Sequence, residues 1–234
     1  MKKFGVILAA ILVLSLAVGT LFGGCVSKET GKLQVVTSTS LLAQIVERVG
    51  GENVEVINII PPAQCPGHFD VKPGDIQMLA GADIFLMHGW QGEKFTDDLI
   101  ASANNPDLNV FQVDVPGNWM TPPVQMEAIE MIAAALSQAD TKNSSEYQKS
   151  AAELAAKIEA KGAEMQDRLA KKNVSSVNVM CAEMQAGFIQ WAGFNIVATY
   201  GRPDSLTPQV VKELVDKGRE GKVTLIIDNM QSGK

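Results

Sequence analysis

The chain has few histidines, few cysteines and no excess of positive charge. Its 234 residues include two histidines and three cysteines, carry a formal net charge of −6, and are only 6% aromatic. A nucleic-acid-binding surface needs clustered lysine and arginine with interleaved aromatic residues, and the sequence has no such stripe. The composition therefore disfavours nucleic acid as a partner and leaves a chain long enough for one large domain or two small lobes.

Signatures of common enzyme classes are missing as well. The sequence contains no Gly-x-Ser-x-Gly, no His-Glu-x-x-His and no glycine-rich loop after its first predicted strand. A secreted thiol enzyme that uses Cys65 with His68 is the alternative that the residues leave open. No orienting acid or oxyanion hole accompanies this pair, so we expect a binding protein and not an enzyme.

Charge is also absent from the N-terminal segment that follows Lys2 and Lys3. A positive start, an apolar run and small residues before a cleavage point form the pattern of a signal peptide, here residues 1–24. The run is also about long enough to span a membrane, so an uncleaved anchor is the alternative. Both interpretations place the rest of the chain outside the cytoplasm.

The residues Leu21-Phe22-Gly23-Gly24-Cys25 resemble the lipobox of bacterial and archaeal lipoproteins. Cleavage in such proteins leaves an N-terminal cysteine that is then lipidated. We therefore expect a lipid on Cys25, a tether over residues 25–32, and a location on the outer face of the cytoplasmic membrane. Cys65 and Cys181 then remain, and outside the cytoplasm such a pair is either a disulfide or a set of soft ligands.

The mature part begins with alternating strand and helix patterns. Strands are predicted at residues 33–37, 54–60, 84–87 and 110–113, and helices follow Ser38-Thr39-Ser40 and occupy residues 75–80 and 93–103. This rhythm predicts a mostly parallel sheet with helices on both faces, which forms a first lobe over residues 33–122.

The rhythm breaks at residues 123–172, where two amphipathic helices are predicted, at 123–136 and 144–172. The second would be about 43 Å long at 1.5 Å per residue, which suits a backbone helix that joins two lobes. Strands at 177–180, 195–198 and 223–227 then alternate with helices at 184–192 and 208–217, which predicts a second lobe over residues 173–234. With three strands and no closing helix, we expect this lobe to be incomplete.

Chemically active side chains follow the predicted strands. Ligands of open parallel sheets lie beyond the carboxyl ends of the strands, and these positions hold Cys65, His68, His88, Cys181, Glu183 and Asp228. Thiolate, imidazole and carboxylate are the ligand types of a transition-metal site.

Each of these residues also has a structural interpretation. Cys65 and Cys181 could form a disulfide, His68 could be a loop histidine without a ligand, Asp228 and Glu183 could cap helices, and Trp90 and Trp119 are expected to pack. His88 is expected to support the site or line its wall, without binding the ion.

Several segments together resemble a known family over nearly all of the chain. They are Val35-Val36-Thr37-Ser38-Thr39-Ser40-Leu41-Leu42-Ala43, Pro61-Pro62 with a loop histidine, residues 69–76, Ala82-Asp83-Ile84-Phe85 with Gly89, Trp119-Met120-Thr121-Pro122, and the long helix. The chain resembles the zinc- and manganese-binding lipoproteins that serve as solute receptors of ABC importers. The resemblance implies two α/β lobes joined by one backbone helix, a metal ion in the cleft, and a membrane permease as partner.

The resemblance also implies individual ligands. His68 matches the first metal histidine of the family and Asp228 its late carboxylate, whereas Gly117 stands at the second histidine position. Cys181 lies at or next to the third ligand position, and Cys65 is an addition. We therefore expect a site of Cys65, His68, Cys181 and Asp228, supported by His88 and Glu183.

Two thiolates favour zinc or copper(I) over manganese, and zinc is the expected ion. The alternative is a receptor of the same fold for a non-metal solute, with Cys65–Cys181 as a disulfide.

Overall fold

A computed structural model describes residues 31–62, 64, 67, 69–90, 93–202 and 205–228. The chain from Lys32 onward forms one compact unit, separate from Met1–Gly31. The signal peptide and Cys25 lie outside the described residues, as do Cys65 and His68. Within the described ranges, no helix has the length and apolar character that a bilayer crossing requires.

The elements alternate as the sequence predicts. In chain order they are β1 (Leu33–Thr37), α2 (Ser40–Gly50), η2 (Gly51–Asn53), β2 (Val54–Asn58), α3 (Pro73–Ala80), β3 (Ile84–Met87), α4 (Phe95–Ala103), β4 (Asn109–Gln112), α5 (Pro122–Ala139), η5 (Thr141–Asn143), α6 (Ser144–Ala170), η6 (Val174–Ser176), β5 (Asn178–Ala182), α7 (Glu183–Trp191), β6 (Asn195–Tyr200), α8 (Pro208–Glu220) and β7 (Leu225–Ile227).

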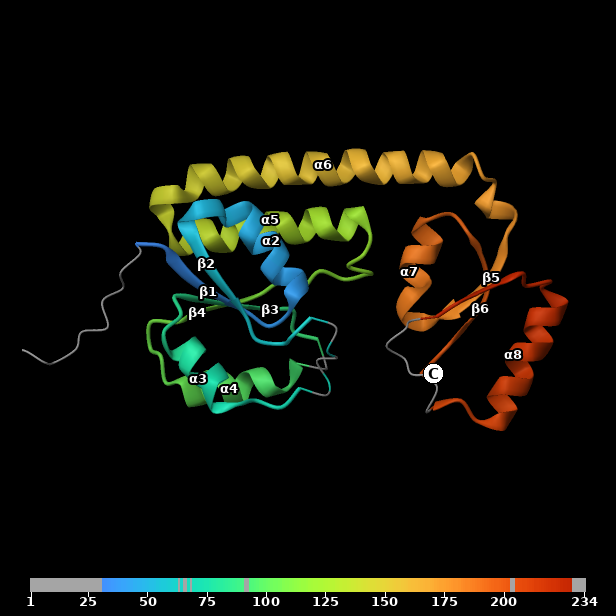
Figure 1. Ribbon diagram of the computed structural model, residues 1–234, viewed down its shortest axis with the longest axis horizontal. Coiled ribbons are helices and arrows are strands. Elements are labelled where there is room, and N and C mark those ends of the chain that lie inside the picture. Colours follow the sequence, from blue (N-terminus) through green and yellow to red (C-terminus); the bar gives the residue numbers. More distant parts are fainter. Residues whose placement is uncertain are drawn as a thin grey trace, which may run out of the picture. The chain divides into compact units, whose positions relative to one another are not determined.

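The first sheet has the strand order β2-β1-β3-β4, and all of its pairs are parallel. Alternate residues of β1 and β3 face opposite sides, so Val35 and Ile84 pack on one face and Val36 and Phe85 on the other. Helices α2, α5 and α6 cover the first face, and α3 and α4 cover the second (Figure 1). Because the connections are helical crossovers, the carboxyl ends of all four strands meet at one edge.

The second sheet has the order β6-β5-β7 and is also parallel. Helix α7 packs against one face, where Val179 and Ile189 are buried, and α8 lies on the other (Figure 1). The predicted fold class, α/β with parallel sheets flanked by helices and a long helix between them, is confirmed. The domain limits predicted at residues 33–122, 123–172 and 173–234 stay a prediction.

Helix α6 connects the two sheets. Tyr147 lies near the start of α6 and is fully buried. It donates a hydrogen bond to Asp140 at the end of α5, with an O–O distance of 2.7 Å. A Cβ atom on Gly162 would lie 2.7 Å from Cγ of Pro122, so α6 passes very close to the start of α5. Further on, Gln166 donates to the carbonyl of Trp191 at the end of α7. Helix α6 thus contacts α5, which covers the first sheet, and the end of α7, which covers the second.

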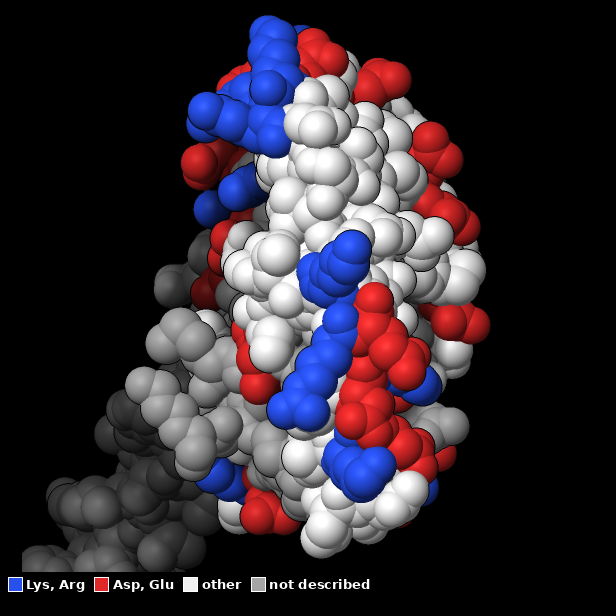
Figure 2. Space-filling model, turned by 90° about the vertical axis from the view of Figure 1, so that its right-hand side faces the viewer, with Lys and Arg blue, Asp and Glu red and all other residues white. Residues whose placement is uncertain are grey.

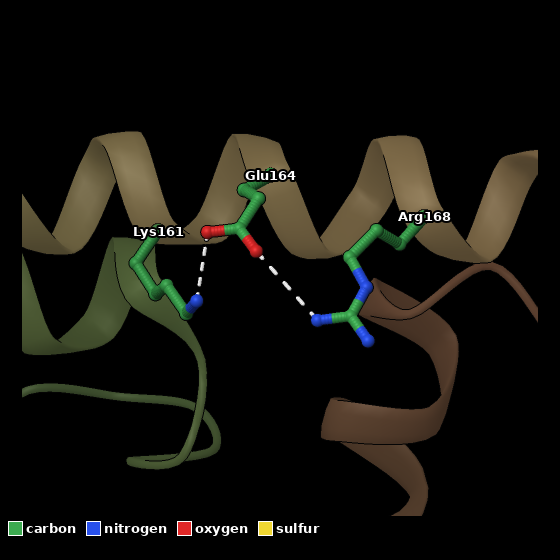
Figure 3. A network of polar contacts seen from close by, with 3 residues as sticks. All are labelled: Lys161, Glu164 and Arg168. Atoms are coloured by element: carbon green, nitrogen blue, oxygen red, sulfur yellow. Dashed lines mark hydrogen bonds and ion pairs between the residues drawn. The ribbon is translucent and has the colours of Figure 1, made fainter.

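One side of α6 carries exposed charged side chains. Glu164 accepts from Lys161 at 2.7 Å and lies 3.6 Å from Arg168 (Figure 3). These side chains are solvent-exposed, and exposed ion pairs contribute little stability. Figure 2 shows a group of basic side chains over the end of α6 and side chains of both signs along α8. We therefore attribute the position of α6 to its buried residues.

Most predicted boundaries differ from the structure by one to three residues, and three of the differences lie near the expected site. Strand β2 ends at Asn58 and not at residue 60, although Ile59 and Ile60 still donate backbone hydrogen bonds to Thr37 and Ser38. Strand β7 begins at Leu225 and not at 223. Helix α4 begins at Phe95 and not at 93. Glu93 therefore precedes the helix, and its side chain accepts hydrogen bonds from Ser38 and Gly89.

Candidate functional site

Polar side chains collect where β1 and β3 end. Ser38 and Thr39 follow β1, and both are buried. Thr39 is the N-cap of α2, and its hydroxyl accepts a long hydrogen bond, 3.5 Å, from the backbone nitrogen of Leu42. The sequence predicted this cap. It did not predict the second contact of the same hydroxyl, with His88.

His88 follows β3 and is completely buried. Its Nε2 atom lies 2.7 Å from Oγ1 of Thr39. The ring of Trp90 stacks on the imidazole at a centroid distance of 3.7 Å, and Trp119 meets it edge-on at 4.3 Å. Trp119 is buried in the core, and its indole donates to the carbonyl of Val115. The packing role expected for both tryptophans agrees with these contacts.

Burial controls the protonation of His88. It lowers the pKa of the imidazole to about 3, because a charged ring would lose its hydration. The ring is therefore neutral over the physiological range. A neutral imidazole has one nitrogen with a lone pair, and this is the form that binds metal ions.

Glu93 joins the loops that follow β1 and β3. Its carboxylate accepts hydrogen bonds from the hydroxyl of Ser38 and from the backbone nitrogen of Gly89, the latter at 2.8 Å. The side chain is only 2% exposed. The sequence pattern predicted Glu93 as part of helix α4 and did not indicate that its carboxylate joins two loops. The usable signal was an acidic residue in the loop directly after a buried strand.

Cys181 lies in the central strand of the second sheet, and its thiol is free and buried. It packs with Val179 and Ile189 on the face that α7 covers. Burial raises the pKa of the Cys181 thiol, since the thiolate is less well solvated there. The thiol thus belongs to a hydrophobic cluster near the carboxyl end of β5.

Asp228 directly follows β7, whose residue Ile227 is paired with Cys181. Tyr200, at the end of β6, donates to the carbonyl of Ile227 at 3.1 Å. Burial raises the pKa of Tyr200, and negative charge on Asp228 and on Cys181 raises it further. The structure therefore brings Cys181 and Asp228 into one neighbourhood around Tyr200.

The loop before α5 contacts the start of α7. The side-chain amide of Asn118 donates to the carbonyl of Met184 at 2.8 Å. A Cβ atom on Gly187 would lie 2.8 Å from Cβ of Asn118, so the two segments pass closely. Glu183 is the first residue of α7 and is exposed, where its charge is favourable at the helix N-terminus.

The predicted ligand set is only partly described. Cys181 and Asp228 are neighbours, whereas Cys65 and His68 lie outside the described residues. Among the residues that are described, no group of three or more His, Cys, Asp or Glu side chains could hold a metal ion. The four-ligand site therefore stays a prediction, whereas the disulfide alternative is not formed in this structure, because the Cys181 thiol is free.

A separate groove lies between α8 and β7. It has a volume of about 680 Å³ and is lined by aliphatic side chains such as Met180, Leu214 and Ile226. Ile226 is 66% exposed, and uncharged surface lies beside the charged side chains of α8 in Figure 2. The described residues that line the groove include no histidine, cysteine or carboxylate, so they do not form the site that the sequence predicts.

Known proteins resemble this chain in sequence. The metal ABC transporter substrate-binding lipoprotein FimA of Streptococcus parasanguinis is 26% identical over 250 residues, which cover 95% of this chain and 80% of the relative. The manganese ABC transporter substrate-binding lipoprotein PsaA of Streptococcus pneumoniae is 25% identical, and the match covers 95% of this chain and 80% of the relative.

Solved structures have the same fold. The substrate-binding protein FpvC of Pseudomonas aeruginosa, in complex with Ni²⁺, has a TM-score of 0.72 at 20% identity and covers 83% of this chain and 77% of its own. A zinc-bound deletion mutant of ZnuA has a TM-score of 0.71 at 20% identity and covers 86% and 82%.

A family model gives the assignment. The model described as "Zinc-uptake complex component A periplasmic" matches residues 35–234, which is nearly the whole part of the chain that follows the tether. The chain therefore belongs to the family of the periplasmic component A of zinc-uptake complexes, and it is a substrate-binding protein of a metal ABC transporter.

Proposed function

We propose that this protein captures a transition-metal ion, zinc above all, and delivers it to an ABC permease in the membrane. The observation that carries the proposal is the proximity of Cys181 and Asp228 at the carboxyl ends of paired strands. A soft and a hard ligand at one sheet edge match the mixed thiolate and carboxylate chemistry that zinc accepts. The first lobe would supply Cys65 and His68 from the loop after β2.

The ligand set decides which metal is preferred. Thiolates select zinc or copper(I), and manganese prefers oxygen ligands. Relatives are named for both zinc and manganese, so family membership does not choose between these ions. We infer zinc as the main cargo and copper(I) as a competitor, from the two cysteines in the set.

The mechanism is capture without catalysis. Ligands from both sheets would let one ion bridge them and favour a closed form, which the permease would recognise. The family consists of transport proteins, and a thiol enzyme would need Cys181 or Cys65 as a reactive thiolate. Burial raises the pKa of Cys181, which argues against that role for it.

A lipid on Cys25 would complete this function, because it keeps the receptor close to its permease. A single acyl chain gives only weak membrane binding, so stable anchoring requires more than one chain or a second signal. The relatives named above are lipoproteins. Replacement of Cys25 by serine should release the protein from membranes, which a fractionation assay measures.

The experiment counts metal and thiols in one sample. The chain from Val26 onward includes the compact unit Lys32–Lys234 and can be purified under argon in reduced form. We expect one zinc per chain by native mass spectrometry, and loss of this zinc in a Cys65→Ala/His68→Ala variant. Asp228→Asn should weaken binding, and Met184→Ala is the matched control because its side chain is 75% exposed.

Two outcomes would contradict the proposal. Wild-type protein without metal and without free thiols would favour a receptor for a non-metal solute with a Cys65–Cys181 disulfide. Alkylation of Cys65 much faster than Cys181 in metal-free protein, together with no metal binding, would favour a thiol enzyme.

A further inference from the structure

Asn118 joins the loop before α5 to the first turn of α7. Its side-chain nitrogen donates to the carbonyl of Met184 at 2.8 Å, and its side-chain oxygen accepts from the backbone nitrogen of Met120 at 2.9 Å. The donor and the acceptor of the amide are therefore both engaged. Because the two bonds use opposite ends of the amide group, they fix its orientation.

The loop that carries Asn118 is itself held against the first sheet. The next residue, Trp119, is buried in the core of this part of the chain, and its indole donates to the carbonyl of Val115. The hydroxyl of Thr121 donates to the carbonyl of Asn118 at 2.7 Å, and Gln125 donates to the carbonyl of Trp119 at 3.0 Å. Asn118 therefore extends toward α7 from a loop that is fixed on both sides.

The other side of the contact belongs to the second sheet. Strand β5 leads directly into α7 without a loop, and Met184 follows Cys181 by three positions. A displacement of the first turn of α7 therefore moves the end of β5. The bond from Asn118 thus reaches the second sheet beside Cys181, which the proposed function uses as a ligand.

Gly187 lets the two segments approach this closely. A Cβ atom on Gly187 would lie 2.8 Å from Cβ of Asn118, whereas non-bonded carbon atoms prefer a separation of about 3.5–4.0 Å. The Cβ of Asn118 is attached to the backbone, so a side-chain rotation does not relieve this clash. A methyl group at position 187 would push the loop and α7 apart. Alanine is otherwise favoured over glycine inside a helix, so the close contact explains the glycine.

We propose that Asn118 and Gly187 are positioning residues that set the separation of the two sheets at the edge where the metal ligands are proposed. The hydrogen bond holds the end of β5 near the first sheet before an ion binds, and the glycine keeps this distance short. The inference rests on the proposed function, in which ligands from both sheets hold one ion. Ligands that are pre-organised lose less freedom on binding, and zinc requires close spacing because its bonds to thiolate are about 2.3 Å long.

Titrations with zinc and cadmium test this role. Gly187→Ala should bind zinc about 10- to 100-fold more weakly than wild type, which is the usual effect of losing a group that orients metal ligands. Cadmium is a larger ion that accepts the same ligands, so its affinity should fall less. A variant that was only less stable would lose affinity for both ions equally. The matched control is Gly218→Ala, because a Cβ atom there would lie 3.4 Å from the flexible end of Met180.

A second variant tests the hydrogen bond without the added methyl group. Asn118→Ala removes the donor to Met184 and keeps Cβ, so it should weaken zinc binding by about 2- to 10-fold, the equivalent of one hydrogen bond. Asn118→Gly also removes the Cβ atom that a methyl group at position 187 would meet. Gly187→Ala should therefore lower the zinc affinity less in the Asn118→Gly background than in wild type.

The outcomes separate this inference from the proposed function. Zinc affinities of Gly187→Ala and Asn118→Ala equal to wild type, with both variants folded by circular dichroism, would overturn the inference and leave the proposed function intact. An equal loss of zinc and cadmium affinity in Gly187→Ala would also overturn the inference alone. Wild-type protein that binds neither zinc nor cadmium would overturn both.

Discussion

The hydroxyl oxygen of Thr39 lies 2.7 Å from Nε2 of His88, although the two residues are 49 positions apart in the sequence. One residue follows β1 and the other follows β3, so the contact joins the ends of two paired strands. The same hydroxyl caps α2. One hydroxyl therefore serves both the helix cap and the buried ring.

Replacement of Thr39 tests this double role. Thr39→Val removes a helix cap and a hydrogen bond to a buried ring, and the free energy of unfolding should fall by about 2 kcal/mol. Thr39→Ser keeps both interactions and should lose less than about 1 kcal/mol. Urea unfolding of metal-free protein measures the difference. Equal losses in both variants would show that the hydroxyl is unimportant.

Removal of Glu93 should destabilise the fold more than its sequence position suggests. Glu93→Ala leaves the buried hydroxyl of Ser38 without this acceptor and also removes the acceptor of the backbone nitrogen of Gly89, which we expect to cost about 2 kcal/mol. The control is Glu52→Ala, because Glu52 is fully exposed and makes only a 3.7 Å ion pair with Lys32. Thermal unfolding of both variants is the measurement, and similar melting temperatures would contradict the buried bridge.

Acid should destabilise the metal-free protein partly through His88. The folded pKa is lowered to about 3 while the unfolded chain titrates at its usual value, so the unfolded state takes up the proton first as the pH falls. The resulting loss in the free energy of unfolding begins near pH 6.5 and reaches about 2 kcal/mol at pH 5. His88→Gln should remove it, so its unfolding free energy should change less between pH 8 and pH 5. Parallel pH profiles for variant and wild type would refute this assignment.

Two helical glycines provide a matched pair. A Cβ atom on Gly162 of α6 would lie 2.7 Å from Cγ of the rigid Pro122, whereas one on Gly218 of α8 would lie 3.4 Å from the flexible end of Met180. Alanine is favoured over glycine in helices by about 1 kcal/mol. We expect Gly218→Ala to be neutral or stabilising and Gly162→Ala to destabilise by about 1–3 kcal/mol through overpacking. Chemical denaturation of both variants decides this, and a stabilising Gly162→Ala would contradict the close approach of α5 and α6.

Local patterns predicted most of the fold. The buried-strand pattern of Leu33–Thr37 and the cap at Ser38-Thr39-Ser40 predicted β1 and the start of α2 correctly. Hydrophobic periodicity identified α6 from a stripe that includes Ala151 and Leu154, and both of these residues are buried. The family that the sequence resembles is also confirmed.

Contacts between distant segments could not be predicted in the same way. Glu93 has helical neighbours in sequence, but its carboxylate is bonded to Ser38, 55 positions earlier, and this tertiary contact keeps it outside α4. His88 was expected as a supporting or wall residue, yet it is buried between two tryptophans. The depth of a side chain at a strand end depends on which loops cover it, and a single sequence does not specify this.

We infer that this chain binds a metal ion through thiolate, imidazole and carboxylate ligands. A competition titration of reduced protein with a chromophoric zinc chelator, repeated between pH 8 and pH 5.5, measures this directly. The account predicts one zinc per chain, with affinity that falls as the pH drops because the ligands must be deprotonated and burial raises the pKa of the Cys181 thiol. Absence of stoichiometric zinc binding at pH 8, or an affinity that does not change with pH, would contradict it.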